Sequence, residues 1–138
     1  MTAYEIRNNI RYNEEQADCC ARQIRRLKEK IAALEHMRER VAGLEAAFDD
    51  SQSRRRKELA AVQNRRYCPK AVSNYYSDMQ TLLSGVDFQA VCHGFGEAKM
   101  RFQKESDDIW NQIEELSVKL GNQREQIVYW KEQLRYIS

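Results

Sequence analysis

Residues 102–137 read FQKESDDIWNQIEELSVKLGNQREQIVYWKEQLRYI, and this stretch decides the fold of the chain. Its apolar residues recur in alternating steps of three and four once Ser106 and Gln123 are accepted as polar members of the series, which comprises Phe102, Ile109, Ile113, Leu116, Leu120, Ile127, Trp130, Leu134 and Ile137. This spacing predicts an amphipathic helix with a heptad seam. Because the rest of its surface is polar or charged, such a helix needs a partner helix to cover the seam.

A second apolar series near the N-terminus is the matching stripe. It runs through Ile6, Ile10, Ala17, Cys20, Ile24, Leu27, Ile31, Leu34, Met37, Val41, Leu44 and Phe48. Two consecutive steps of three around Leu34 predict a local shift of phase, known as a stammer. We take as the structural seam of the pair Ile24, Leu27, Ile31 and Leu34 in the first helix and Ile113, Leu116, Leu120, Ile127 and Leu134 in the last.

The residues between the two seams predict a shorter helical middle. Asp49, Asp50 and Ser51 are good helix caps, so the first helix is predicted over about 3–48 and a new one over about 51–67. The alternative, one uninterrupted helix as far as Tyr67, stays open because neither Gly nor Pro separates the two. Pro69 ends whatever precedes it, and a short helix is predicted over about 70–84.

Glycines supply the second interruption. Gly85 follows the short helix, and Gly94 and Gly96 flank Phe95. Glycines in this arrangement predict a turn over about 85–96, with the long C-terminal helix over about 97–137.

These elements predict a single all-α domain over residues 1–138. The expected architecture is an elongated, coiled-coil-like antiparallel hairpin of two long helices, with the shorter helices at one end. The alternative is that each seam pairs with the same seam of a second copy, giving a homodimer.

Composition restricts the classes of function. The net charge is +2, with 23 basic and 21 acidic residues, so no global field steers the chain to nucleic acid or to a membrane. No apolar run is long enough to span a bilayer, and residues 1–20 lack the pattern of a secretory signal peptide. A cytoplasmic protein whose four cysteines (Cys19, Cys20, Cys68 and Cys92) are free thiols is expected.

No constellation of residues predicts catalysis, a cofactor or a metal. Cys92 adjoins His93, but the chain contains no Cys-x-x-Cys or His-x-x-x-His spacing. No third group that would orient a Cys–His pair can be identified, and His36 is expected at the surface. The chain is therefore predicted not to be an enzyme.

One segment is strongly basic. Residues 51–70 hold Arg54, Arg55, Arg56, Lys57, Arg65, Arg66 and Lys70 against Glu58 alone. Four consecutive basic residues on a helix point in all directions and form a poor face for reading a groove. A coiled-coil scaffold or nucleic-acid-associated protein using residues 54–70 is kept as the alternative function.

A further group of residues lies off the C-terminal seam. Trp110, Val118, Tyr129 and Tyr136 loosely follow a second face of the same helix. Exposed apolar patches mark interaction surfaces, so these residues are the predicted interface with a helical partner. The competing expectation is that the shorter middle helices fold back and cover them.

The stretch GFGEAKMRF from Gly94 to Phe102 resembles the W-x-G-x-A-x-x-x-F signature of the WXG superfamily, the small helical-hairpin proteins exported by type VII secretion systems. Gly96, Ala98 and Phe102 match the Gly, Ala and Phe of that signature, while Gly94 stands at the Trp place beside Phe95. In the superfamily this motif joins two antiparallel helices.

The pattern of the whole chain is similar to that of accessory proteins of LXG toxins in Gram-positive bacteria. Those proteins bind the helical N-terminal domain of the toxin and aid its export. The resemblance implies such a toxin domain as partner, with a second small helical accessory protein as a further one. No Tyr has Asp or Glu four residues later, as the export tail of the superfamily requires. Export together with the partner is therefore expected.

Overall fold

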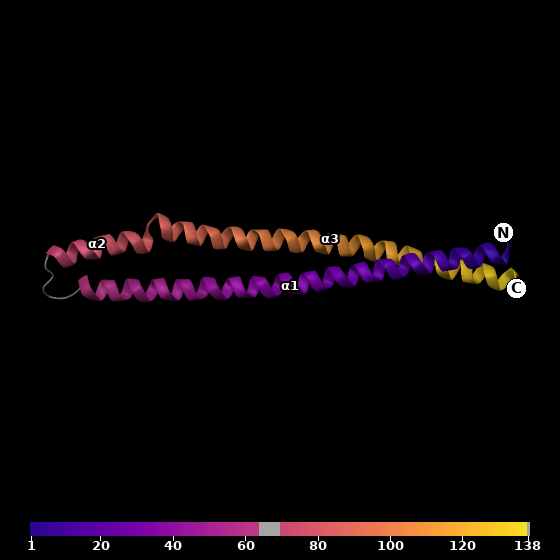
Figure 1. Cartoon of the computed structure of the whole chain (residues 1–138), viewed down its shortest axis with the longest axis horizontal. Helices are drawn as coiled ribbons and strands as arrows, with labels where there is room; N and C mark the ends of the chain where they lie inside the picture. Colours follow the sequence, from indigo (N-terminus) through magenta and orange to yellow (C-terminus); the bar gives the residue numbers. More distant parts are fainter. Residues whose placement is uncertain (64–69, 138) are drawn as a thin grey trace. The chain divides into compact units, whose positions relative to one another are not determined.

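The structure, a computed structural model, describes residues 1–63 and 70–137 (Figure 1). Helix α1 covers Ala3–Gln63, α2 covers Lys70–Ser84 and α3 covers Val86–Ile137, and no strand occurs in the described ranges. The short helix predicted over about 70–84 corresponds to α2. The predicted helix end at Tyr67 and the roles given to Cys68 and Pro69 lie outside the described residues.

A capping box starts helix α1. Thr2 Oγ1 accepts a hydrogen bond from the backbone N–H of Glu5 at 3.2 Å, and the Glu5 carboxylate accepts one from the backbone N–H of Thr2 at 3.0 Å. The first N–H groups of a helix have no acceptor within the helix, so this reciprocal pair stabilises the first turn.

Helix α1 continues past Phe48, so the predicted end there was wrong, and the alternative of one uninterrupted helix agrees with the structure as far as Gln63. Residues 49–51 are of types that favour helix caps, but inside a helix each costs only about half a kcal/mol relative to Ala. Packing offsets this cost, because the Phe48 ring stacks on the Phe88 ring of α3 with centroids 5.7 Å apart. The helix therefore runs on to Gln63.

Gly85 separates α2 from α3. The hydroxyls of Thr81 and Ser84 donate hydrogen bonds to carbonyls four residues earlier, at 3.0 and 2.6 Å, and such bonds commonly bend a helix. A Cβ at Gly85 would lie 2.3 Å from the carbonyl oxygen of Thr81. Only glycine fits this close approach, which explains why the chain bends here.

Gly94 and Gly96 lie inside α3, so the predicted turn over about 85–96 and the predicted helix start at 97 were wrong. Neither glycine has a positive φ, and a Cβ at either would meet nothing within 4 Å. Each glycine costs the helix about 1 kcal/mol relative to Ala. The half-buried Phe95 and Phe102, seven residues apart on one side of the helix, hold it in place despite that cost.

The chain forms two compact units, of which the first combines Met1–Leu34 with Lys104–Ser138. Here the first part of α1 packs antiparallel to the last part of α3, and the unit contains both ends of the chain (Figure 1). Lys131 Nζ lies 3.6 Å from the Glu14 carboxylate. The buried residues of this unit are Ile6, Ala17, Cys20, Ile31, Leu34, Ile109 and Ile113.

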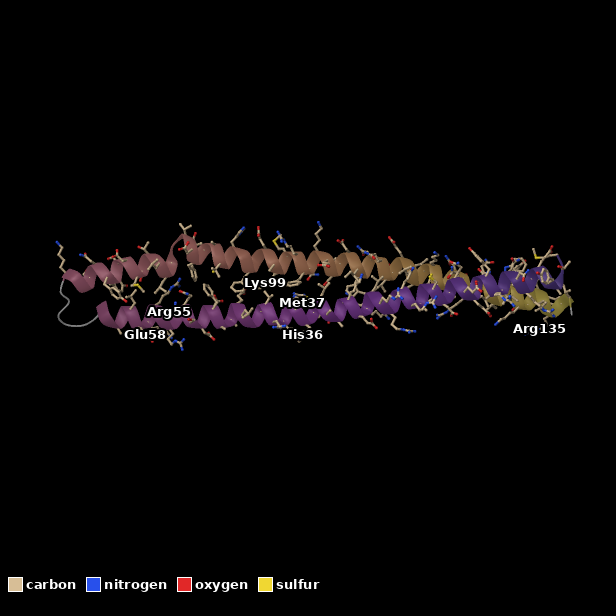
Figure 2. The ribbon with its side chains drawn as sticks, viewed as in Figure 1. His36, Met37, Arg55, Glu58, Lys99 and Arg135 are labelled. Carbon is tan, nitrogen blue, oxygen red and sulfur yellow. The ribbon has the colours of Figure 1, made fainter. Side chains whose placement is uncertain are left out.

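The second unit covers Glu35–Gln103 and is also antiparallel. Its contacts pair falling residue numbers on α1 with rising numbers later in the chain: Arg56 with Leu83, Glu45 with Lys99, and Arg38 with Gln103. Figure 2 shows Lys99 on the side of α3 that faces α1. Within each unit, therefore, the all-α antiparallel hairpin predicted from the two seams is confirmed.

One uninterrupted heptad series accounts for the burial along α1. Its members are Ala3, Ile6, Ile10, Asn13, Ala17, Cys20, Ile24, Leu27, Ile31, Leu34, Arg38, Val41, Glu45, Phe48, Gln52, Arg55 and Leu59, and all except the two arginines are buried or half-buried. The predicted stammer was wrong, because Met37 and Leu44 are 52% and 64% exposed. Arg38 and Glu45 take the seam positions beside them, where each has a partner across the unit.

The predicted structural seam corresponds to buried or half-buried positions on both helices. Ile31, Leu34 and Ile113 are buried, and the half-buried members are Ile24, Leu27, Leu116, Leu120, Ile127 and Leu134. In the second unit the seam of α3 continues through Phe102, Lys99, Phe95, Cys92 and Phe88. In the second unit the seam of α3 therefore alternates the rings of Phe88, Phe95 and Phe102 with the polar side chains of Cys92 and Lys99.

Candidate partner-binding surface

The predicted interface residues are exposed on α3 in the first unit. Trp110 is 50% exposed, Val118 60%, Tyr129 49% and Tyr136 84%. Within the first unit no helix covers them, and the competing expectation, that the shorter middle helices fold back over them, stays a prediction. Eleven residues separate Val118 from Tyr129 and seven separate Tyr129 from Tyr136, close to three and two helical turns. These three side chains therefore lie on one side of the helix, which we define, together with Trp110 on its flank and Val128, as the outer face.

Tyr129 is held in place by a residue of the seam. Its ring meets the Trp130 ring edge to face, with centroids 5.0 Å apart and an interplanar angle of 73°. Trp130 is half-buried, so it anchors the exposed ring beside it. An aromatic side chain restrained in this way loses little conformational entropy on binding and suits an interface anchor.

A shallow groove runs beside Val118. Asn111, Glu114 and Glu115 form its other walls. Both carboxylates are exposed, and neither pairs with a basic group in the described ranges. The groove thus combines an apolar floor with an acidic rim.

The residues of the WXG-like motif have structural positions in the second unit. Gly94, Phe95, Gly96, Ala98 and Phe102 all lie within α3 and form no turn. The Phe95 ring is 6.0 Å from the Phe48 ring, centroid to centroid. Phe95, Ala98 and Phe102 are half-buried, whereas the glycines are exposed.

The basic run at residues 54–57 divides between packing and solvent. Arg56 Nη2 donates a hydrogen bond to the carbonyl of Leu83 at 3.0 Å, and its guanidinium lies 4.7 Å from the centre of the Phe88 ring. Arg55 lines a groove against α2. Arg54 and Lys57 are exposed. The four charges therefore do not form one continuous basic face, and Arg65 and Arg66 lie outside the described residues.

Sequence reasoning missed the groove between α1 and α2 in the second unit. It is lined by Arg55, Glu58, Leu59, Tyr75, Met79 and Leu83, has a volume of about 360 Å³, and contains both buried leucines of the unit. The spacing of Tyr75, Met79 and Leu83, four residues apart each time, is a signal for this apolar face. The sequence does not reveal that residues 55–59 lie opposite, because the bend at Gly85 determines that pairing.

The chemistry-bearing side chains are dispersed. No group of three His, Cys, Asp or Glu side chains within residues 1–63 and 70–137 is placed to hold a metal ion. Cys19 and Cys92 are free and at least partly accessible, Cys20 is free and buried, and His93 pairs with Glu97 at 3.1 Å on the surface. His36 is exposed (Figure 2).

Comparison with known protein families, with curated proteins and with solved structures finds no match. In the described part of the chain no helix is both long enough and apolar enough to cross a bilayer.

Proposed function

We propose that this chain is a non-enzymatic adaptor that binds a helical protein partner through the outer face of α3. The observation that carries the proposal is the exposure of Trp110, Tyr129 and Tyr136 on a helix whose seam is already covered within the chain. Large aromatic side chains in such positions are the usual anchors of protein interfaces.

The partner we propose is the helical N-terminal domain of an LXG-type toxin of a type VII secretion system, with which the chain is exported. The resemblance of residues 94–102 to the WXG signature supports this choice in sequence alone, since these residues form no turn here. A helical surface is a suitable receptor for another amphipathic helix, since apolar anchors at helical spacing can interdigitate with those of a partner.

The test is a calorimetric titration of the purified chain with the helical N-terminal domain of an LXG-type toxin. Trp110→Ala and Tyr129→Ala should weaken complex formation about tenfold or more while leaving the thermal melt of the free chain nearly unchanged. Leu120→Ala is the matched control and should lower the melting temperature, because Leu120 belongs to the seam. If the two aromatic variants unfold the free chain as severely as Leu120→Ala, the outer face is core and the proposal is wrong.

A further inference from the structure

Between residues 107 and 132 the outer face of α3 has a single sign of charge, and Arg135 follows beside Tyr136 at the end of this face. From residue 107 to residue 132 every charged side chain on the side of the helix opposite the seam is acidic: Asp107, Asp108, Glu114, Glu115, Glu125 and Glu132. The basic residues of this stretch, Lys119, Arg124 and Lys131, lie on the two flanks of the helix, with Arg124 and Lys131 on the same flank as Trp110, and Lys131 pairs with Glu14. The exposed aromatic and apolar side chains therefore stand within an acidic surface.

Four of these carboxylates form no direct ion pair in the described part of the chain, although Lys119 and Arg135 lie within one helical turn of Glu115 and Glu132. Glu114, Glu115, Glu125 and Glu132 are exposed and form no ion pair with any described residue. Like charges on neighbouring helical turns repel one another, and the structure gains nothing from that repulsion in the free chain. A cationic ligand would relieve it.

We propose that the outer face of α3 binds an amphipathic helix whose apolar stripe is flanked by Lys and Arg. This inference rests on the proposed function and specifies the charge of the partner. Trp110, Val118 and Tyr129 would receive the apolar stripe, and the surrounding carboxylates would meet the basic flanks. Aromatic rings also attract cations, so Tyr129 and Trp110 favour the same class of ligand.

The sign of the charge excludes two other kinds of partner for this face. Phosphates of nucleic acids and the headgroups of anionic membranes are both negative, and each would be repelled by the row of carboxylates. A protein segment of positive charge is the class of macromolecule that satisfies both the apolar and the acidic features. Complementary charge of this type chiefly increases the association rate and selects the correct partner.

The experiment uses two synthetic helical peptides with one common apolar stripe, flanked by Lys in the first peptide and by Glu in the second. Binding to the full chain is measured by fluorescence anisotropy of the labelled peptides at two salt concentrations. The Lys peptide should bind, with an affinity that falls at higher salt, and the affinity of the Glu peptide should be lower by about tenfold or more. Equal affinity for both peptides would overturn the inference.

Isosteric variants locate the charge requirement. Changing Glu114, Glu115, Glu125 and Glu132 together to Gln should lower the affinity for the Lys peptide about tenfold or more. Four substitutions are combined because each exposed ion pair contributes only a small part of the binding free energy. The control carries Glu15→Gln, Asp18→Asn and Glu29→Gln, which neutralise three exposed carboxylates on α1 of the same unit, and the loss of affinity is compared per charge removed. If the control variant weakens binding as much, the attraction is non-specific and the inference is wrong.

The natural complex separates this inference from the proposed function. If the four Gln substitutions leave toxin-domain binding intact while Tyr129→Ala abolishes it, the binding face is right and the charge assignment is overturned. If neither set matters, the proposed function fails as well. Self-association in sedimentation equilibrium that disappears in the Arg54→Gln, Lys57→Gln variant would make a second copy the occupant and overturn the inference.

Discussion

The glycines of α3 provide the sharpest test of the fold, because the sequence and the structure assign them opposite roles. Gly94 and Gly96 resemble a turn in the sequence but lie inside a continuous helix, with nothing within 4 Å of either ideal Cβ. In a helix interior Gly is about 0.8 to 1 kcal/mol less favourable than Ala. Each Gly→Ala substitution should therefore stabilise the chain by up to about that amount.

The double variant Gly94→Ala, Gly96→Ala should gain more than either single variant, up to about 2 kcal/mol, because neither new methyl group meets another atom within 4 Å. Gly85→Ala is the matched control. Its new methyl group would lie 2.3 Å from the carbonyl oxygen of Thr81, a backbone atom, so something must shift. A loss of about 1 to 3 kcal/mol is expected, as for other overpacked sites.

Urea unfolding followed by far-ultraviolet circular dichroism measures all three free energies, and an unchanged dependence on urea shows that the same transition is compared. Destabilisation of the chain by Gly94→Ala and Gly96→Ala, as by Gly85→Ala, would contradict a continuous helix at these positions. That result would place a turn at residues 94–96.

Three further predictions test the seam and the thiols. Leu34→Ala should lower the unfolding free energy by about 2 to 4 kcal/mol and Leu44→Ala by less than about 1 kcal/mol, because the two residues are 9% and 64% exposed. Similar losses for both in urea unfolding would mean that Leu44 belongs to the seam, as the predicted stammer requires. Gln52→Leu should increase the unfolding free energy by about 1 to 2 kcal/mol and so raise the melting temperature, because Gln52 Oε1 is buried without a hydrogen-bond partner among the described residues. A lower melting temperature would contradict this. Alkylation mapped by mass spectrometry should modify the exposed Cys92 in the native chain and spare the buried Cys20 until unfolding, and equal rates would count against the assigned burial.

The apolar seam could be predicted wherever apolar side chains fill it. In the first unit most seam positions are Ile, Leu, Ala or Trp, so periodicity alone located them. In the second unit Arg38, Glu45 and Gln52 occupy one column of the α1 seam. A series built from apolar residues alone includes Met37 and Leu44, each one residue before the true seam residues Arg38 and Glu45, and so shows an apparent change of phase. Partners that lie far away in the sequence, here Gln103 and Lys99, decide the true register.

The residues of the candidate surface could be predicted from the sequence because they do not fit the heptad seam. Tyr129 and Tyr136 do not fit the seam, and a hairpin of two helices leaves their side of α3 uncovered. The acidic character of the same face was missed, because it emerges only when charged residues are sorted by the side of the helix on which they lie. The edge-to-face packing of Tyr129 on Trp130 also depends on side-chain rotamers, which spacing does not determine.

The aromatic residues are divided between the two units in a way that makes the chain its own spectroscopic reporter. Both tryptophans, Trp110 and Trp130, belong to the first unit, whereas all four phenylalanines, Phe48, Phe88, Phe95 and Phe102, belong to the second. Emission excited at the red edge of indole absorption therefore follows the first unit alone, while circular dichroism sums the helices of both. Two separated midpoints during denaturation would show that the units melt independently, and one coincident midpoint would show that they cooperate.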